Sequence, residues 1–181
     1  MKGLLTYAIL LSSLLSSTGC KDNNTLSGSQ KILFQYSFTC APGTQRNEGV
    51  IIDSQGNVLL FSNPSGWNVP DRNAMLSNNQ VEENLAQCRF SGMKIPVSEL
   101  TRFSGYINNI FSSKVSAGKK VSQGRGTYGY YCYYFSAADS TYRQVIIRMH
   151  GDTDCENLNF YSRKVVDWIN LLIRDLPVQQ P

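Results

Sequence analysis

This sequence of 181 residues has no long apolar run, a single histidine and a small net charge. A membrane-spanning helix needs about 20 predominantly apolar residues, and no segment reaches that composition. The net charge of +4 at pH 7 is too small to indicate a nucleic-acid partner. These absences favour a globular domain that binds no nucleic acid.

The sequence also lacks the residue spacings that mark metal sites and catalytic nucleophiles. It has no CxxC pair, and its single histidine, His150, fits no metalloprotease or EF-hand pattern. No recognisable motif ties a serine or cysteine to this histidine. The sequence therefore indicates no cofactor and no metal, and it favours a binding or structural role over catalysis.

One segment leaves a catalytic interpretation open. In residues 150–154, HGDTD, the histidine stands near Asp152 and Asp154 at the end of an expected strand, where a general base is conceivable. The protein would then be a small hydrolase or a glycan-processing enzyme. We favour the structural alternative, because Asp and Gly commonly form turns after strands.

Residues 1–19 have the three-part build of an export signal. Lys2 supplies the charge, an apolar run follows, and Ser17 and Gly19 are the small residues before Cys20. Gly19-Cys20 resembles the lipobox of bacterial lipoproteins, in which the cysteine thiol accepts a diacylglyceryl group; Ser17 stands where that motif usually has Leu. The resemblance implies a lipid on Cys20 and a membrane as partner. Plain secretion is the alternative.

The number of cysteines favours lipidation. Removing Cys20 from the five leaves an even set, Cys40, Cys88, Cys132 and Cys155, which suits disulfides in an oxidising compartment. Three pairings are possible, and we favour Cys40 with Cys88 and Cys132 with Cys155. Zinc is the competing explanation, but the cysteine spacings are wide.

The domain follows a polar segment. We predict a lipidated N-terminus and flexible tether over residues 20–31, then a single domain over residues 32–177. Alternating apolar residues predict a strand from Ile32 to Cys40, buried on one face. Two short apolar runs flank residues 53–57 and predict a hairpin.

The rest of the chain mixes helices and strands. Ser77 and Gln80 form a capping-box pattern before one helix, and a second helix is expected from Pro96 to about Val115. Strands are predicted at 127–136 and 143–150, and a last helix at about 160–175. Because no βαβ alternation occurs, we predict an α+β fold: a mostly antiparallel sheet with about three helices on one face.

Strand 127–136 is rich in tyrosine on both faces, with Tyr130 and Cys132 on one face and Tyr131 and Tyr133 on the other. We interpret these rings as core. Exposed rings would instead provide a surface for a glycan or protein ligand. Lys119, Lys120 and Arg125 in the preceding loop are then the nearest candidate cations, although such charges are usually a solvated surface.

Residues 49–58, GVIIDSQGNV, followed by Asn63-Pro64 and Trp67, resemble small, uncharacterised cell-envelope lipoproteins of the Bacteroidota. Gly151-Asp152, Asn157 and Asp167-Trp168 are also similar to that family. The resemblance implies an envelope location, which we expect to be the outer membrane, and no established activity.

Overall fold

The computed structural model describes residues 28–40 and 46–176. The predicted signal sequence and Cys20 lie outside the described residues. Within the described residues, no helix is long and apolar enough to cross a membrane.

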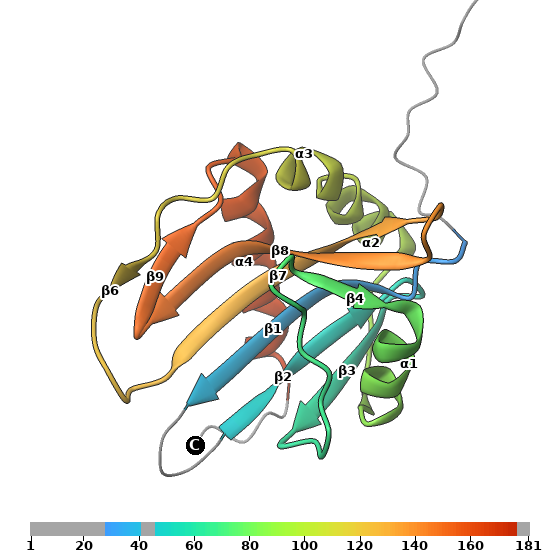
Figure 1. The fold of residues 1–181 in the computed structure, drawn as a ribbon. Helices are drawn as coiled ribbons and strands as arrows, with labels where there is room; N and C mark the ends of the chain where they lie inside the picture. The colour runs from blue at the N-terminus through green and yellow to red at the C-terminus, as the bar shows by residue number, and fades with distance from the viewer. Residues whose placement is uncertain (1–27, 41–45, 177–181) are drawn as a thin grey trace, which may run out of the picture.

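The centre of the fold is an antiparallel sheet of nine strands with the order β5-β3-β2-β1-β7-β8-β9-β6, in which β4 also pairs with β8 (Figure 1). The strands are β1 Ile32–Cys40, β2 Arg46–Asp53, β3 Asn57–Ser62, β4 Met75–Ser77, β5 Arg89–Lys94, β6 Lys119–Lys120, β7 Thr127–Ser136, β8 Thr141–Gly151 and β9 Thr153–Glu156. All the described pairings are antiparallel. The α+β prediction is confirmed.

Helices cover both faces of the sheet. They are α1 Asn78–Ala86, α2 Val97–Ser104, α3 Ile107–Phe111 and α4 Phe160–Arg174. Helices α2, α3 and α4 pack on one face, where Leu100, Ile110 and Val165 join the larger core cluster. Helix α1 packs on the opposite face, where Val81 contacts a smaller cluster around Ile51 and Tyr133. The prediction that the helices share one face is therefore wrong for α1.

Strand β1 is buried on both faces, although its alternating pattern predicts burial on one. A register shift between Ile32 and Phe34 moves Ile32 to the α1 face, while both Leu33 and Phe34 join the core under α4. The polar Gln35 and Ser37 are buried too. The start of β1 therefore has packed neighbours on both faces, the cluster under α4 on one face and the cluster under α1 on the other.

The hairpin predicted around residues 53–57 is present as β2 and β3. Asp53 Oδ1 accepts hydrogen bonds from the backbone N–H groups of Gln55 and Asn57, at 2.9 and 2.7 Å. Gly56 has φ of +81°, a conformation that glycine adopts without steric cost. Trp67 stacks on Phe61, with ring centroids 4.5 Å apart. Residues that carry the family resemblance thus build this turn and its packing.

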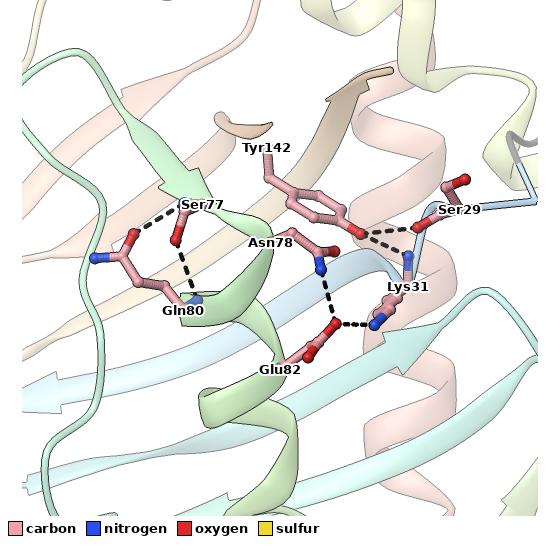
Figure 2. A network of polar contacts seen from close by, with 7 residues as sticks. All are labelled: Ser29, Lys31, Ser77, Asn78, Gln80, Glu82 and Tyr142. Atoms are coloured by element: carbon pink, nitrogen blue, oxygen red, sulfur yellow. Dashed lines mark hydrogen bonds and ion pairs between the residues drawn. The ribbon is translucent and has the colours of Figure 1, made fainter. Parts of the chain in front are cut away.

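The last residues of the predicted tether belong to the folded domain (Figure 2). Tyr142 Oη accepts a hydrogen bond from Lys31 N at 2.8 Å and donates one to Ser29 O at 3.3 Å. Gln30 is 7% exposed and donates to Tyr133 O at 2.9 Å. Residues 29–31 therefore belong to the folded domain, and the tether prediction is wrong for them.

Helix α1 starts as predicted and takes part in the same network (Figure 2). Ser77 N donates to Gln80 Oε1 at 2.8 Å, and Gln80 N donates to Ser77 Oγ at 3.2 Å, which completes the capping box. One turn later, Glu82 forms an ion pair with Lys31 and accepts a hydrogen bond from Asn78. Helix α1 thus holds the chain that enters β1.

Candidate functional site

A hollow of about 1210 Å³ forms a groove beside the C-terminal end of α4. Antiparallel register aligns Tyr130, Tyr36, Val50, Leu60 and Arg89 across β7, β1, β2, β3 and β5, and all of these except Tyr130 line its floor. Tyr128, Phe38, Glu48 and Ser62 form the next row across the first four of these strands. We call this surface the aromatic groove.

Three rings dominate its floor. Tyr36 and Tyr128 are stacked with centroids 6.2 Å apart, and Phe38 lies 4.7 Å from Tyr128. Tyr128 is 39% exposed, so part of this surface is open to solvent. The interpretation of the tyrosines as core holds for the buried Tyr133 but not for Tyr128.

The phenol groups of Tyr36 and Tyr130 remain neutral at physiological pH. Burial raises the pKa of Tyr36 above its ordinary value, with Tyr130 and Tyr128 adding to the effect. Burial also raises the pKa of Tyr130, whose hydroxyl donates a hydrogen bond to Asn170 Oδ1 at 2.7 Å. That bond ties α4 to the sheet at the edge of the groove.

Three arginines line the aromatic groove together with these rings. Arg46 lies over the Phe38 ring, 5.6 Å from its centroid, and forms an ion pair with Glu48 at 2.8 Å. At the end of α4, Arg174 Nε lies 4.0 Å from Asp175 Oδ1. Arg89 also lines the groove and has no carboxylate within ion-pair distance among the described residues. The groove thus joins an aromatic floor to a basic rim.

A smaller hollow of about 290 Å³ adjoins the groove and shares Tyr36, Tyr128 and Asn170 with it. His150 and Arg148 line this hollow. His150 Nδ1 lies 3.0 Å from Asp154 Oδ1, and the two side chains are 62% and 43% exposed. The structure therefore brings two members of the predicted His150, Asp152 and Asp154 cluster together beside an aromatic surface.

Asp152 is engaged elsewhere. Its carboxylate accepts hydrogen bonds from Ser122 Oγ at 2.8 Å and from the backbone N–H groups of Gly124, Arg125 and Gly126. The Ser122 bond and these amides lower the pKa of Asp152. Asp152 thus anchors the loop before β7, as the structural interpretation predicts, and the three-residue cluster does not form.

Two of the cations expected near the tyrosines, Lys119 and Lys120, lie apart from the groove, and the third, Arg125, lines neither of the two described hollows. Lys119 and Lys120 form β6, which pairs with β9 at the far edge of the sheet. Arg46, Arg89, Arg148 and Arg174 take that place, and sequence reasoning missed all four. Alternation within each strand could have suggested the faces of Arg46, Arg89 and Arg148, but only the tertiary structure shows that these residues and Arg174 of α4 meet.

The four cysteines of the domain are free thiols. Cys132 on β7 lies opposite Val145 of β8, and Cys155 on β9 lies opposite Met149 of β8. Their Cα atoms are therefore separated by two strand spacings, about 10 Å, and by an additional offset along the strands. Cys40 is the last residue of β1, and Cys88 directly precedes β5. Strands β2 and β3 lie between β1 and β5 in the sheet, so these two cysteines are also far apart. Since a disulfide needs Cα atoms within about 7 Å, neither favoured pair is formed.

No group of three or more His, Cys, Asp or Glu side chains suited to a metal ion occurs in the described part of the chain. In comparisons with known proteins, no family model, no curated protein and no solved structure matches this chain. The resemblance to envelope lipoproteins therefore stays a prediction from the residues that carry it.

Proposed function

We propose that this protein is a lipid-anchored domain of the bacterial cell envelope that binds a ligand in the aromatic groove. The observation that carries the binding role is the groove itself. Partly exposed rings provide apolar area with polar tips, and arginines beside them provide directed donors. Such a surface suits recognition.

Membrane attachment in this proposal relies on the Gly19-Cys20 motif. The even number of remaining cysteines gives it no support, because the structure separates them as free thiols. Cys20 precedes Ser29, whose carbonyl accepts a hydrogen bond from Tyr142, by only nine residues. A lipid on Cys20 would hold the domain close to the outer membrane.

The anchor is tested by the intact mass of the protein in the membrane fraction. Wild type is expected to begin at Cys20 and to carry diacylglyceryl and acyl mass, while Cys20→Ser is expected in the soluble fraction without it. A soluble wild type of unmodified mass contradicts the anchor.

The binding role is tested by retention of the purified domain on isolated envelope polymers: peptidoglycan, surface polysaccharide and outer-membrane protein. Tyr128→Ala is expected to lose retention. Phe160→Ala is the matched control, since Phe160 is 74% exposed and does not line the groove. Equal retention of the two variants contradicts the proposal.

A small hydrolase or glycan-processing enzyme is the second candidate, favoured by the placing of the His150–Asp154 pair at the smaller hollow. A carboxylate at one ring nitrogen orients an imidazole for proton transfer at the other. Replacement of His150 by Ala distinguishes the two candidates. It abolishes turnover of an enzyme's substrate and leaves the retention of a binding protein largely unchanged.

A further inference from the structure

We propose that the ligand of the aromatic groove is an acidic saccharide, a sugar chain whose rings carry carboxylates. This inference rests on the proposed binding function. It adds a chemical class to the ligand, which follows from the charge, the rings and the shape of the groove.

Charge selects an anion. Arg46, Arg89 and Arg174 line the groove, and Glu48 is the only carboxylate among its described lining residues. Because Glu48 pairs with Arg46, the guanidinium of Arg89 is left without an acidic partner. Arg148 adds a further cation at the adjoining hollow. A guanidinium binds a carboxylate through two parallel hydrogen bonds, which gives direction as well as attraction.

The floor favours sugar rings over a peptide. Strand β1, which carries Tyr36 and Phe38, is hydrogen-bonded to β2 on one side and to β7 on the other, so the aromatic part of the floor offers no free strand edge to which a peptide could add. The terminal strand of the sheet on this side is β5, three strands away from β1. The floor offers ring surfaces instead. The centroid of the Tyr36 ring lies 5.2 Å from that of Tyr130 and 6.2 Å from that of Tyr128. The neutral phenol groups of Tyr36 and Tyr130 can hydrogen-bond sugar hydroxyls.

The length of the groove favours a chain over a single sugar. Its described lining extends from Arg89 on β5 to Tyr128 on β7, which are four strand spacings apart, or about 19 Å. Arginine at one end and tyrosine at the other can thus contact different rings of one extended oligomer.

The test is calorimetric titration of the purified domain with hexagalacturonate, which has a carboxylate on every ring, and with its methyl ester, which has the same rings without charge. We expect the acid to bind, with an affinity that falls as salt rises, and the ester to bind at least about tenfold more weakly. Arg89→Ala is expected to weaken binding of the acid about tenfold or more. Arg163→Ala, an exposed cation on α4 outside the groove, should leave it unchanged.

Equal affinity for acid and ester overturns the proposal, as does an Arg89→Ala variant that binds like wild type. So does failure to bind hexagalacturonate, whether or not polyglutamate or oligothymidylate binds in its place. If hexagalacturonate fails but Tyr128→Ala still abolishes retention on envelope polymers, the ligand class is wrong and the binding function stands. If Tyr128→Ala retains full binding to those polymers, the binding function itself is wrong.

Discussion

At the scale of single residues, Asp152 shows how one carboxylate organises a loop that lines no groove. Its oxygens accept three backbone N–H groups and the Ser122 hydroxyl, and these bonds favour the ionised form. The same bonds explain why the residue has a structural role although it follows the histidine by two positions. A carboxylate held in this way is poorly placed to act as a base.

Replacing Asp152 by Asn is expected to lower the midpoint of thermal unfolding at neutral pH. Because the folded state lowers the pKa of Asp152 below its usual 3.8, ionisation stabilises the fold above that value. The contribution is lost as the pH falls through the lower pKa of the folded state. The difference between wild type and Asp152→Asn in thermal scans should therefore shrink in acid below that value.

Asp167→Asn is the matched control, since Asp167 is exposed on α4 and takes part in no described hydrogen bond or ion pair. An equal change of midpoint in both variants, or a difference from wild type that persists in strong acid, contradicts the anchoring role of Asp152.

The cysteines give a second prediction at this scale. In Cys20→Ser protein exported and unfolded without reductant, alkylation is expected to modify four thiols, because no favoured pair lies within disulfide distance. In the native protein Cys132 should react last. Burial raises its pKa and leaves its side chain 0% exposed, so neither thiolate nor reagent is available there. Fewer than four modified cysteines by mass spectrometry would show that disulfides form.

At the scale of elements, α1 depends on its N-terminal cap. Ser77→Ala removes the acceptor for Gln80 N and is expected to destabilise the protein by about 1 kcal/mol in urea unfolding. Ser98→Ala in the first turn of α2 is the control, because that helix has no side-chain cap bond. Its change should stay within about 0.5 kcal/mol. Equal losses in the two variants would mean that the cap contributes nothing.

The segment that enters β1 gives a further prediction. Tyr142→Phe deletes the hydroxyl that bonds Ser29 and Lys31, and we expect a loss of about 1–2 kcal/mol with faster hydrogen exchange at the Lys31 amide. Tyr161→Phe is the control, since the Tyr161 hydroxyl makes no hydrogen bond among the described residues and its ring stacks on Tyr106. Unchanged exchange at Lys31 would contradict the docking of this segment.

At the scale of the whole molecule, the groove and the entering chain lie at opposite ends of the sheet. The chain enters at Ile32, beside the turn that follows Asp53, whereas Phe38 and Tyr128 lie toward the other end of β1 (Figure 1). Strand β1 has nine residues and is about 30 Å long. A lipid on Cys20 would therefore leave the groove facing away from the membrane.

This orientation can be measured with the lipidated protein on vesicles that contain a gadolinium-bearing lipid. Amide signals of the turn at residues 53–57 are expected to be attenuated strongly, and those of Glu48 and Tyr128 weakly. Lipid without gadolinium is the control. The opposite ranking, or equal attenuation at both ends, would contradict the proposed orientation.

Local sequence determines much of this protein. Alternating apolar residues specify β1, aromatic and β-branched runs specify β7 and β8, and the turn chemistry of Asp53 and Gly56 specifies a hairpin, because these signals depend on neighbours within a few positions. The Ser77–Gln80 box specifies the start of α1 for the same reason. The α+β class follows from the order of these elements.

The tertiary structure alone decided which residues meet. Arg89, Tyr36 and Tyr128 are far apart in sequence and share one groove because the strand order places β5, β3, β2, β1 and β7 side by side. The same order keeps the cysteines apart and places α1 on the opposite face from α4. Periodicity fixes the face of a side chain within its strand, but long-range pairing chooses its neighbours, and the groove depends on those neighbours.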